Sequence, residues 1–237
     1  MSGQFTICLE GLRKAYGDRM VLDIDTLAFD STRSYALVGP NGSGKSTLLK
    51  VLSGVIDSSG GIVDVTGDAS RDTLTVGYMP QKSYAFGFSV FRNVAMALGE
   101  SKMPKAQVND IVNEALEAVG MADMANARGS GLSGGEAQRV ALARILVRDL
   151  DVVLLDEPTA SMDLAGTALV EEALRAYRER TGCLMLTATH APAQAHRIAE
   201  ETVMLSGGRV VEQGATSAVL AHPTSPEGQA FLSYWSV

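Results

Sequence analysis

The fold is decided by Gly39-Pro40-Asn41-Gly42-Ser43-Gly44-Lys45-Ser46-Thr47. Apolar residues 35–38 before this stretch predict a buried strand, and residues 48–52 after it predict a helix. The spacing is that of a phosphate-binding loop, G-x-x-x-x-G-K-S/T. Glycines let backbone N–H groups turn toward phosphate oxygens, and the helix that begins there adds the positive end of its dipole. The alternative, a Gly/Ser turn that matches by chance, has a frequency of about one in ten thousand per position, so we predict nucleotide binding.

The composition sets bounds on the kind of protein. The chain has 237 residues, 46% of them apolar, which is enough for one large domain or a domain with a subdomain. A formal net charge of -7 and the lack of a long basic run argue against broad nucleic-acid binding. Cys8 and Cys183 lie among apolar residues, which favours unpaired thiols in a reducing compartment over a disulfide or a metal site. With no apolar run of about 18 residues and no signal-peptide pattern at residues 1–4, we expect a soluble, cytoplasmic protein.

The segment before the phosphate loop predicts short strands at 5–9 and within 20–29, joined by a charged loop at 11–18. That loop contains Tyr16, whose ring could pack on the domain or stack on an adenine ring. A later strand, Thr73–Met79, ends just before Gln81. Gln81 is either a surface residue or a side chain that reaches Mg²⁺ or the attacking water.

Helical periodicity replaces the strand pattern from Lys82 to about Gly131. Val90–Leu98 is one predicted helix, and Gln107–Val119 is another, with apolar residues on one face. We interpret this block as a small helical subdomain inserted into the sheet domain.

A second glycine-containing motif, Leu132-Ser133-Gly134-Gly135-Glu136, precedes the predicted helix 137–147. Ser133 and Glu136 form a capping box, so the motif could be only a helix start. Each glycine in a first turn, however, costs roughly 1 kcal/mol of helix stability relative to alanine. We therefore predict that something approaches this backbone closely, and a phosphate is the natural candidate.

The continuous apolar run 152–155 is typical of a central parallel strand, and it ends in Asp156 and Glu157. Ligands of open α/β sheets bind at the carboxyl ends of such strands. There Lys45 could reach the β- and γ-phosphates, and Ser46 and Asp156 could hold Mg²⁺ directly or through water. Glu157 could act as general base on the attacking water. The alternative is an ordinary pair of charges at a strand end.

A further buried strand, Cys183–Thr189, ends at His190, which has either a structural role or a hydrogen bond to the γ-phosphate. Glu201–Leu205 and Arg209–Gln213 predict a hairpin, and a short helix is expected near Val219. The tail after residue 221 contains three aromatic residues that could pack on the domain or on a partner: Phe231, Tyr234 and Trp235.

In this order the motifs resemble the ATPase subunit of ATP-binding cassette (ABC) transporters over essentially the whole chain. By that resemblance Tyr16 is the adenine-stacking aromatic, Gly39–Thr47 the Walker A loop, and Gln81 the Q-loop glutamine. Leu132–Glu136 is the family signature, Val152–Glu157 is the Walker B strand, Ser161–Asp163 is the D-loop and His190 is the switch histidine. Two departures are Met162, where alanine or leucine is commoner, and Ala191-Pro192, where an acidic residue often follows the histidine.

The resemblance implies an α/β P-loop NTPase fold: a mostly parallel central sheet, an N-terminal antiparallel β region and an inserted helical subdomain. It implies one ABC ATPase domain over 1–237, with the helical subdomain at about 82–148 and a flexible or partner-contacting tail at 222–237. ATP and Mg²⁺ are the implied bound groups. The implied catalytic residues are Glu157, His190 and Gln81, and the implied metal ligands are Ser46, Gln81 and Asp156. The implied nucleotide contacts are Tyr16, Gly39, Pro40, Asn41, Gly42, Ser43, Gly44, Lys45, Ser46, Thr47, Ser133, Gly134 and Gly135.

The resemblance also implies partners. Two ATPase domains meet head to tail, so that Ser133–Gly135 of one cover the ATP of the other, and the second domain is a copy or a relative. An integral membrane permease and a solute-binding protein are expected as well, with the ATPase peripheral at the cytoplasmic face of the plasma membrane. The permease contact is expected near Gln81, through aromatic residues that could instead be local core: Tyr84, Phe86, Phe88 and Phe91.

Residues 89–94 look similar to bacterial importers, and the nearest resemblance is to oxyanion importers for tungstate, molybdate or phosphate. Three alternatives stay open at this point. They are a soluble ABC ATPase such as the iron–sulfur assembly type, an exporter ATPase, and a regulatory subunit that binds ATP without hydrolysing it. Intact Glu157 and His190 argue against the last of these.

Overall fold

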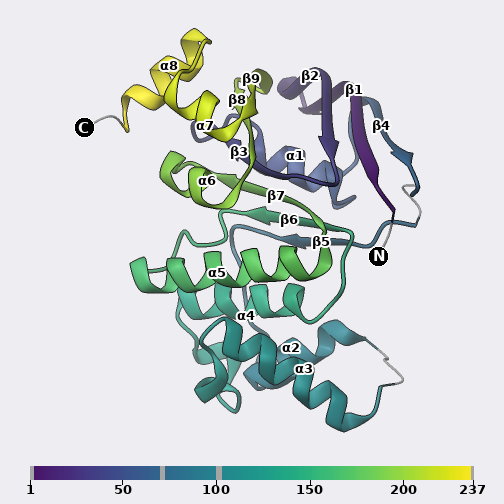
Figure 1. Cartoon of the computed structure of the whole chain (residues 1–237), viewed down its shortest axis with the longest axis vertical. Coiled ribbons are helices and arrows are strands. Elements are labelled where there is room, and N and C mark those ends of the chain that lie inside the picture. The colour runs from purple at the N-terminus through teal and green to yellow at the C-terminus, as the bar shows by residue number, and fades with distance from the viewer. Residues whose placement is uncertain (1–2, 70–72, 100–102, 236–237) are drawn as a thin grey trace. The chain divides into compact units, whose positions relative to one another are not determined.

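The computed structural model describes residues 3–69, 73–99 and 103–235, and these divide into two compact units (Figure 1). The first unit contains the residues up to Tyr78, Asp151–Glu157 and the residues from Gly182 onward. The second contains Met79–Leu150 and Pro158–Thr181. Met1 and Ser2, and the last two residues of the predicted tail, lie outside the described residues.

The first unit is built on a six-stranded sheet in the order β5-β6-β7-β3-β8-β9. The pairs β6–β7, β7–β3 and β3–β8 are parallel, and β9 alone is shown to run antiparallel to its neighbour. Every residue of β3, β6 and β7 is buried, as expected for central strands covered on both faces. The predicted mostly parallel sheet is therefore confirmed. Its strands are β3 (Ser34–Val38), β5 (Val76–Met79), β6 (Val152–Asp156), β7 (Leu184–Thr189), β8 (Glu201–Ser206) and β9 (Arg209–Ala215).

A separate antiparallel sheet has the order β2-β1-β4 and comprises β1 (Phe5–Tyr16), β2 (Arg19–Asp30) and β4 (Gly60–Gly67). The predicted charged loop at 11–18 is wrong, because β1 continues through it as far as Tyr16. Leu12 is fully buried, while Arg13 beside it faces solvent and pairs with Asp23 of β2 at 3.2 Å. The charged residues form the solvated side of a strand, and this one-sided exposure concealed the strand in the sequence.

Helix α1 (Lys45–Leu52) lies between the two sheets, where Leu48 and Leu49 are fully buried among residues of β1, β2, β3, β6, β7 and β8. A second buried cluster joins β3 and β8 to α6 (Pro192–Ile198), α7 (Thr216–Ala221) and α8 (Pro226–Ser233). The short helix expected near Val219 is confirmed as α7. In the tail, Ser225 caps α8 and Leu232 is buried, so this segment packs on its own domain.

The second unit is helical, and its predicted helices are confirmed. It contains α2 (Val90–Ala95) with a 3₁₀ turn at Met96–Leu98, α3 (Lys105–Ala118), α4 (Gly134–Leu146) and α5 (Leu164–Thr181), with short 3₁₀ turns at Ala122–Met124 and Gly129–Gly131. Helices α3, α4 and α5 pack against one another (Figure 1). The apolar face of α3 supplies buried Val112, Ala115 and Leu116, which is the face expected from its periodicity.

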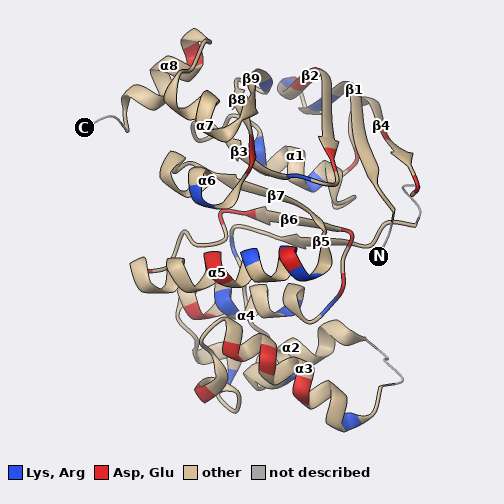
Figure 2. Cartoon of the chain, viewed as in Figure 1, with Lys and Arg blue, Asp and Glu red and all other residues tan. Residues whose placement is uncertain are grey.

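Charge is distributed over many elements. Figure 2 shows Lys and Arg interspersed with Asp and Glu on strands and helices alike. In the first unit Asp23 pairs with both Arg13 and Arg209, which lowers the pKa of Asp23 through these two hydrogen bonds. Across residues 3–69, 73–99 and 103–235, the helices are too short or too polar to cross a lipid bilayer.

Candidate active site

The loop between β3 and α1 can only be built with glycine at two positions. Gly39 has φ 144°, and a Cβ there would lie 2.1 Å from the carbonyl oxygen of Leu205. Gly44 has φ 107°, and its Cβ would lie 2.7 Å from Leu22. Both positions therefore require left-handed backbone and close approach at once. The loop that results leads into α1, whose first turn has no side-chain cap and no acidic residue, so its N–H groups are available to an anion.

Lys45 is buried at the start of α1, and its Nζ donates to the carbonyl oxygens of Gly39 at 2.7 Å and Pro40 at 3.1 Å. Burial lowers the pKa of Lys45, and the negative charges of Glu157 and Asp156 oppose this effect. The loop thus holds an ammonium group against its own carbonyl oxygens, which are weaker acceptors than phosphate oxygens.

The Ser43 hydroxyl gives a direct test of whether the loop fits a ligand. Its Oγ is buried and makes no hydrogen bond to any residue that the structure describes. A buried polar group left without a partner costs about 1–3 kcal/mol. An oxygen-rich ligand in the loop would satisfy this hydroxyl, so the residues present fit a bound phosphate.

Ser46 and Asp156 meet at the end of β6. The Ser46 hydroxyl donates to Oδ1 of Asp156 at 2.9 Å, and the carboxylate is almost fully buried. A hydroxyl and a carboxylate are oxygen donors of the kind that Mg²⁺ prefers. Tyr78 of β5 also lies here, although its type gave no functional signal in the sequence. Its hydroxyl is buried, and burial together with the negative charge of Asp156 raises the pKa of Tyr78 above its ordinary value.

Glu157 and His190 form the second half of the site. Nδ1 of His190 lies 2.9 Å from both carboxylate oxygens of Glu157. Because an ionised carboxylate only accepts hydrogen bonds, Nδ1 is the protonated nitrogen. Nε2 is the ring nitrogen that does not contact Glu157. Glu157 has φ 51°, which costs an ordinary residue of order 1–3 kcal/mol. Its N–H donates to the carbonyl of Ala188 at 3.0 Å, which fixes this backbone against β7.

Trp235 contacts the same histidine from the C-terminal segment. Its ring centroid lies 6.1 Å from that of His190, with the two planes at 42°. Aromatic pairs attract at this separation. The sequence could not connect the two residues, since it left open whether the tail aromatics pack on the domain or on a partner.

Tyr16 ends β1, with 51% of its surface exposed, and the Nζ of Lys14 lies 5.3 Å from the centre of its ring. An exposed ring with an adjacent cation has the properties needed to stack on a nucleobase. The adenine contact stays a prediction, and Tyr16 lies at a strand end instead of in a loop.

The remaining predicted residues, Gln81 and Ser133–Gly135, belong to the second unit. Ser133 caps α4, and the capping box is confirmed, since the Ser133 N–H donates to Oε2 of Glu136 at 2.7 Å and the Glu136 N–H donates to Oγ of Ser133 at 3.3 Å. The N–H and the hydroxyl of Ser133 both donate to the Glu136 carboxylate, and these two bonds hold the pKa of Glu136 below its ordinary value.

The two glycines of this motif differ. A Cβ on Gly135 would lie 2.6 Å from the carbonyl oxygen of Ser161, so the chain's own backbone explains that glycine. A Cβ on Gly134 would have its nearest contact at 3.7 Å, which is ordinary packing. Gly134 is exposed, and nothing in its surroundings requires a glycine. The expectation that a phosphate approaches this turn therefore rests on Gly134.

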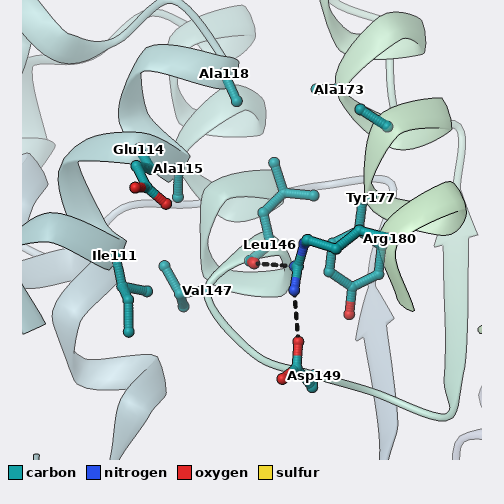
Figure 3. A pocket seen from close by; sticks show the side chains of 11 residues that line it. Ile111, Glu114, Ala115, Ala118, Leu146, Val147, Asp149, Ala173, Tyr177 and Arg180 are labelled. Atoms are coloured by element: carbon teal, nitrogen blue, oxygen red, sulfur yellow. Dashed lines mark hydrogen bonds and ion pairs between the residues drawn. The ribbon is translucent and has the colours of Figure 1, made fainter. Parts of the chain in front are cut away.

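The second unit also contains a pocket of about 360 Å³ among α3, α4 and α5 (Figure 3). Its walls are mainly aliphatic, and at its edge Arg180 pairs with Asp149 at 2.7 Å and stacks on Tyr177. None of the predicted site residues lines it. The candidate active site is therefore the loop region and not this pocket.

The strand, glycine loop and helix, with two carboxylates at the end of a parallel strand of the same sheet, define a phosphate-loop nucleotide-binding domain. A family model described as ABC transporter matches residues 22–160. The chain belongs to the ABC transporter family and has the fold and ATPase class expected from its motifs.

Three relatives illustrate the similarity. The phosphate import ATP-binding protein PstB 2 of Natronomonas pharaonis is 37% identical, over 96% of this chain and 86% of the relative. The tungstate uptake system ATP-binding protein TupC of Peptoclostridium acidaminophilum is 36% identical, over 87% of this chain and 97% of the relative. The structure of cbiO1 from Clostridium perfringens, part of the ABC transporter complex cbiONQ, superposes with a TM-score of 0.75 at 26% identity, over 91% of this chain and 90% of that chain.

Proposed function

We propose that this ATPase subunit drives the import of an oxyanion through a membrane permease, with Glu157 as the general base of ATP hydrolysis. The observation that supports the catalytic part is the gathering of five side chains on one unit of the fold. They come from the glycine loop, the end of β6 and the end of β7: Lys45, Ser46, Asp156, Glu157 and His190.

The roles follow from the contacts. Lys45 exchanges two backbone carbonyls for the β- and γ-phosphate oxygens, and the loop N–H groups and Ser43 bind the remaining oxygens. Ser46 and Asp156 would hold Mg²⁺, which supplies charge neutralisation at the phosphates when bound. Glu157 takes a proton from the attacking water. His190, oriented through Nδ1 by Glu157, presents Nε2 to the γ-phosphate.

A second ATPase domain completes the site in this proposal. The chain has one signature motif and one phosphate loop, and Ser133 and Gly134 are exposed at the start of α4. An exposed helix N-terminus with a hydroxyl cap can bind the γ-phosphate of a nucleotide held by another copy. Gln81, whose side chain is also exposed, would contribute its amide to the metal or to the water.

The permease contact is assigned to an aromatic loop, residues 84–88. Tyr84 is 63% and Phe86 37% exposed, and the rings of Tyr84, Phe86 and Phe88 pack in sequence at 5.3 and 5.4 Å. Buried Asn93 holds the loop, since its Nδ2 donates to the carbonyls of Phe86, Phe88 and Ser89, and its Oδ1 accepts from the Phe86 N–H. Arg144 adds a bond to the carbonyl of Tyr84 at 2.9 Å. A rigid, exposed aromatic surface suits an apolar helix of a membrane partner.

The cargo proposal rests on the relatives. Two ATP-binding proteins that are more than 35% identical to this chain are named for phosphate import and for tungstate uptake. Because an ATPase subunit does not contact the cargo in this scheme, no residue of the chain selects between the two anions.

The decisive experiment is capture of the tagged chain from detergent-solubilised membranes of its own source. Stoichiometric recovery of a polytopic membrane protein is expected, with ATPase activity stimulated by phosphate or tungstate together with the cognate solute-binding protein. Recovery of soluble partners alone would contradict the transport proposal and favour the non-transport ABC ATPases. A captured permease whose ATPase activity ignores both anions would contradict the oxyanion assignment only.

A further inference from the structure

One buried side chain of the second unit touches two of the predicted motifs. Gln138 lies in the second turn of α4 and has only 2% of its surface exposed. Its Nε2 donates to the carbonyl oxygen of Gln81 at 3.3 Å, and its Oε1 accepts from the N–H of Ser161 at 3.1 Å. The amide orientation is fixed by these partners, since a carbonyl only accepts and an N–H only donates.

The Ser161 peptide is held from two sides of the same helix. Its N–H donates to Gln138, and its carbonyl oxygen lies only 2.6 Å from the position that a Cβ on Gly135 would occupy. Ser161 therefore cannot move toward or away from the start of α4 without breaking a hydrogen bond or closing on the helix backbone. The Gln81 carbonyl is tied to the same helix, whereas the Gln81 side chain is exposed.

We propose that Gln138 is a positioning residue, which keeps the Gln81 segment and the Ser161 segment in a fixed relation to the signature turn. The proposal rests on the proposed function, because it gives the three segments their roles at a shared ATP site. When ATP engages one segment, the Gln138 amide transmits that placement to the other two. An apolar side chain of the same length would fill the same space, but without the hydrogen bonds to Gln81 and Ser161 it would not couple the positions of these segments.

The test compares three variants of the full chain: Gln138→Met, Gln138→Glu and the control Thr202→Val. Methionine keeps the volume and removes both hydrogen bonds. Glutamate keeps an acceptor for the Ser161 N–H, but it replaces the hydrogen bond to the Gln81 carbonyl by repulsion between that carbonyl and a buried carboxylate. Thr202→Val also removes a buried hydrogen bond, to Thr216 at 3.0 Å, in the first unit and outside every predicted motif.

For Gln138→Met we expect kcat to fall about tenfold, because misplacing catalytic segments by a fraction of an ångström has effects of this size. The affinity for a fluorescent ATP analogue should stay within about twofold, because the phosphate loop is intact. The fall in kcat for Gln138→Glu should be at least as large, because its buried carboxylate repels the Gln81 carbonyl. Thr202→Val should lower the melting temperature by a similar amount and leave kcat unchanged.

Two results would overturn the inference. One is a parental kcat in Gln138→Met, and the other is an equal fall of kcat in Thr202→Val at equal loss of stability, which would reduce Gln138 to a structural residue. Glu157→Gln separates this failure from failure of the proposed function. If Glu157→Gln loses turnover while Gln138→Met does not, the catalytic site stands and only the positioning role is wrong.

Discussion

The phosphate loop and the signature turn both combine glycines with a helix start, yet they are built in opposite ways. In the loop Lys45 and the Ser43 hydroxyl are buried, and that hydroxyl makes no hydrogen bond to the described residues. At the signature turn Ser133 and Gly134 are exposed, and Ser133 and Glu136 satisfy each other. The loop is an incomplete site that needs a ligand, whereas the signature turn is complete alone and presents a surface. This difference is what a site shared between two copies requires.

The largest expected effect comes from a substitution in the phosphate loop. Lys45→Ala removes a buried ammonium that donates two hydrogen bonds to the loop and that we propose turns to the phosphate oxygens when ATP binds. Charge-assisted bonds of this kind contribute about 1.5–3 kcal/mol each. We expect ATP affinity to fall by about 100-fold or more, measured by equilibrium binding of a fluorescent analogue. Lys50→Ala, on the same helix, is the control and should bind normally. Unchanged affinity in Lys45→Ala would contradict the phosphate-loop assignment.

Glu157→Gln separates ATP binding from ATP hydrolysis at the same phosphate-loop site. The amide cannot act as a general base, whose loss costs about 10² to 10⁴ in rate. We expect ATP binding to persist, turnover to be lost and a nucleotide-bound dimer to accumulate, seen by light scattering. Asp25→Asn, which changes an exposed carboxylate of β2 outside every predicted motif, serves as a control for charge alone on stability. Parental hydrolysis by Glu157→Gln would show that another group is the base.

Gly134→Ala tests the signature half without disturbing its fold. The added methyl group meets nothing closer than 3.7 Å within the chain, and alanine is the better helix former by up to about 1 kcal/mol, so the melting temperature should not fall. If a phosphate of a second copy approaches this turn, the methyl group blocks it, and turnover should fall about tenfold, equivalent to about 1.4 kcal/mol. ATP affinity of the isolated chain should stay the same. Full activity in Gly134→Ala would remove the signature turn from the site.

The two regions also differ in how well the sequence predicts them. The loop, the Asp156–Glu157 pair and the capping box are each made by residues close together in the chain, so local spacing defines their geometry. The contacts of Gln138 could not be predicted, because its partners lie 57 and 23 residues away and a buried glutamine has no pattern of its own. Trp235 beside His190 depends in the same way on how the C-terminal segment returns to the sheet.

The wrong prediction of a loop at 11–18 arose because the local composition was misleading. Residues 11–18 are charged and contain two glycines, a composition that favours a loop. Pairing with β2 overrides this preference, because each backbone bond and the Arg13–Asp23 ion pair depend on a neighbour strand. Tyr16 is consequently placed by strand register, which fixes the direction of its side chain more closely than a loop would.

The smallest expected effect concerns the C-terminal segment, where Trp235 contacts His190. Burial works to raise the pKa of Glu212, but N–H and hydroxyl donors of Thr224 and Ser225 outweigh it and hold the pKa below its ordinary value of 4.5. A carboxylate with a lowered pKa in the folded chain stabilises it above the ordinary value, and this contribution is lost as the pH falls through the folded pKa. Acid should therefore loosen the start of α8.

Trp235 reports this event, because it is the only tryptophan in the chain. In Glu212→Gln an amide NH₂ replaces one acceptor oxygen and faces the donors of Thr224 and Ser225, so the segment should loosen at neutral pH. We expect a small red shift of Trp235 emission in this variant at pH 7, and the same shift in the parent only in acid. Glu227→Gln, which removes an exposed charge from the same segment, should behave as the parent. If all three chains emit alike across the pH range, Glu212 does not anchor the segment, and the contact of Trp235 with His190 depends on the packing of Leu232.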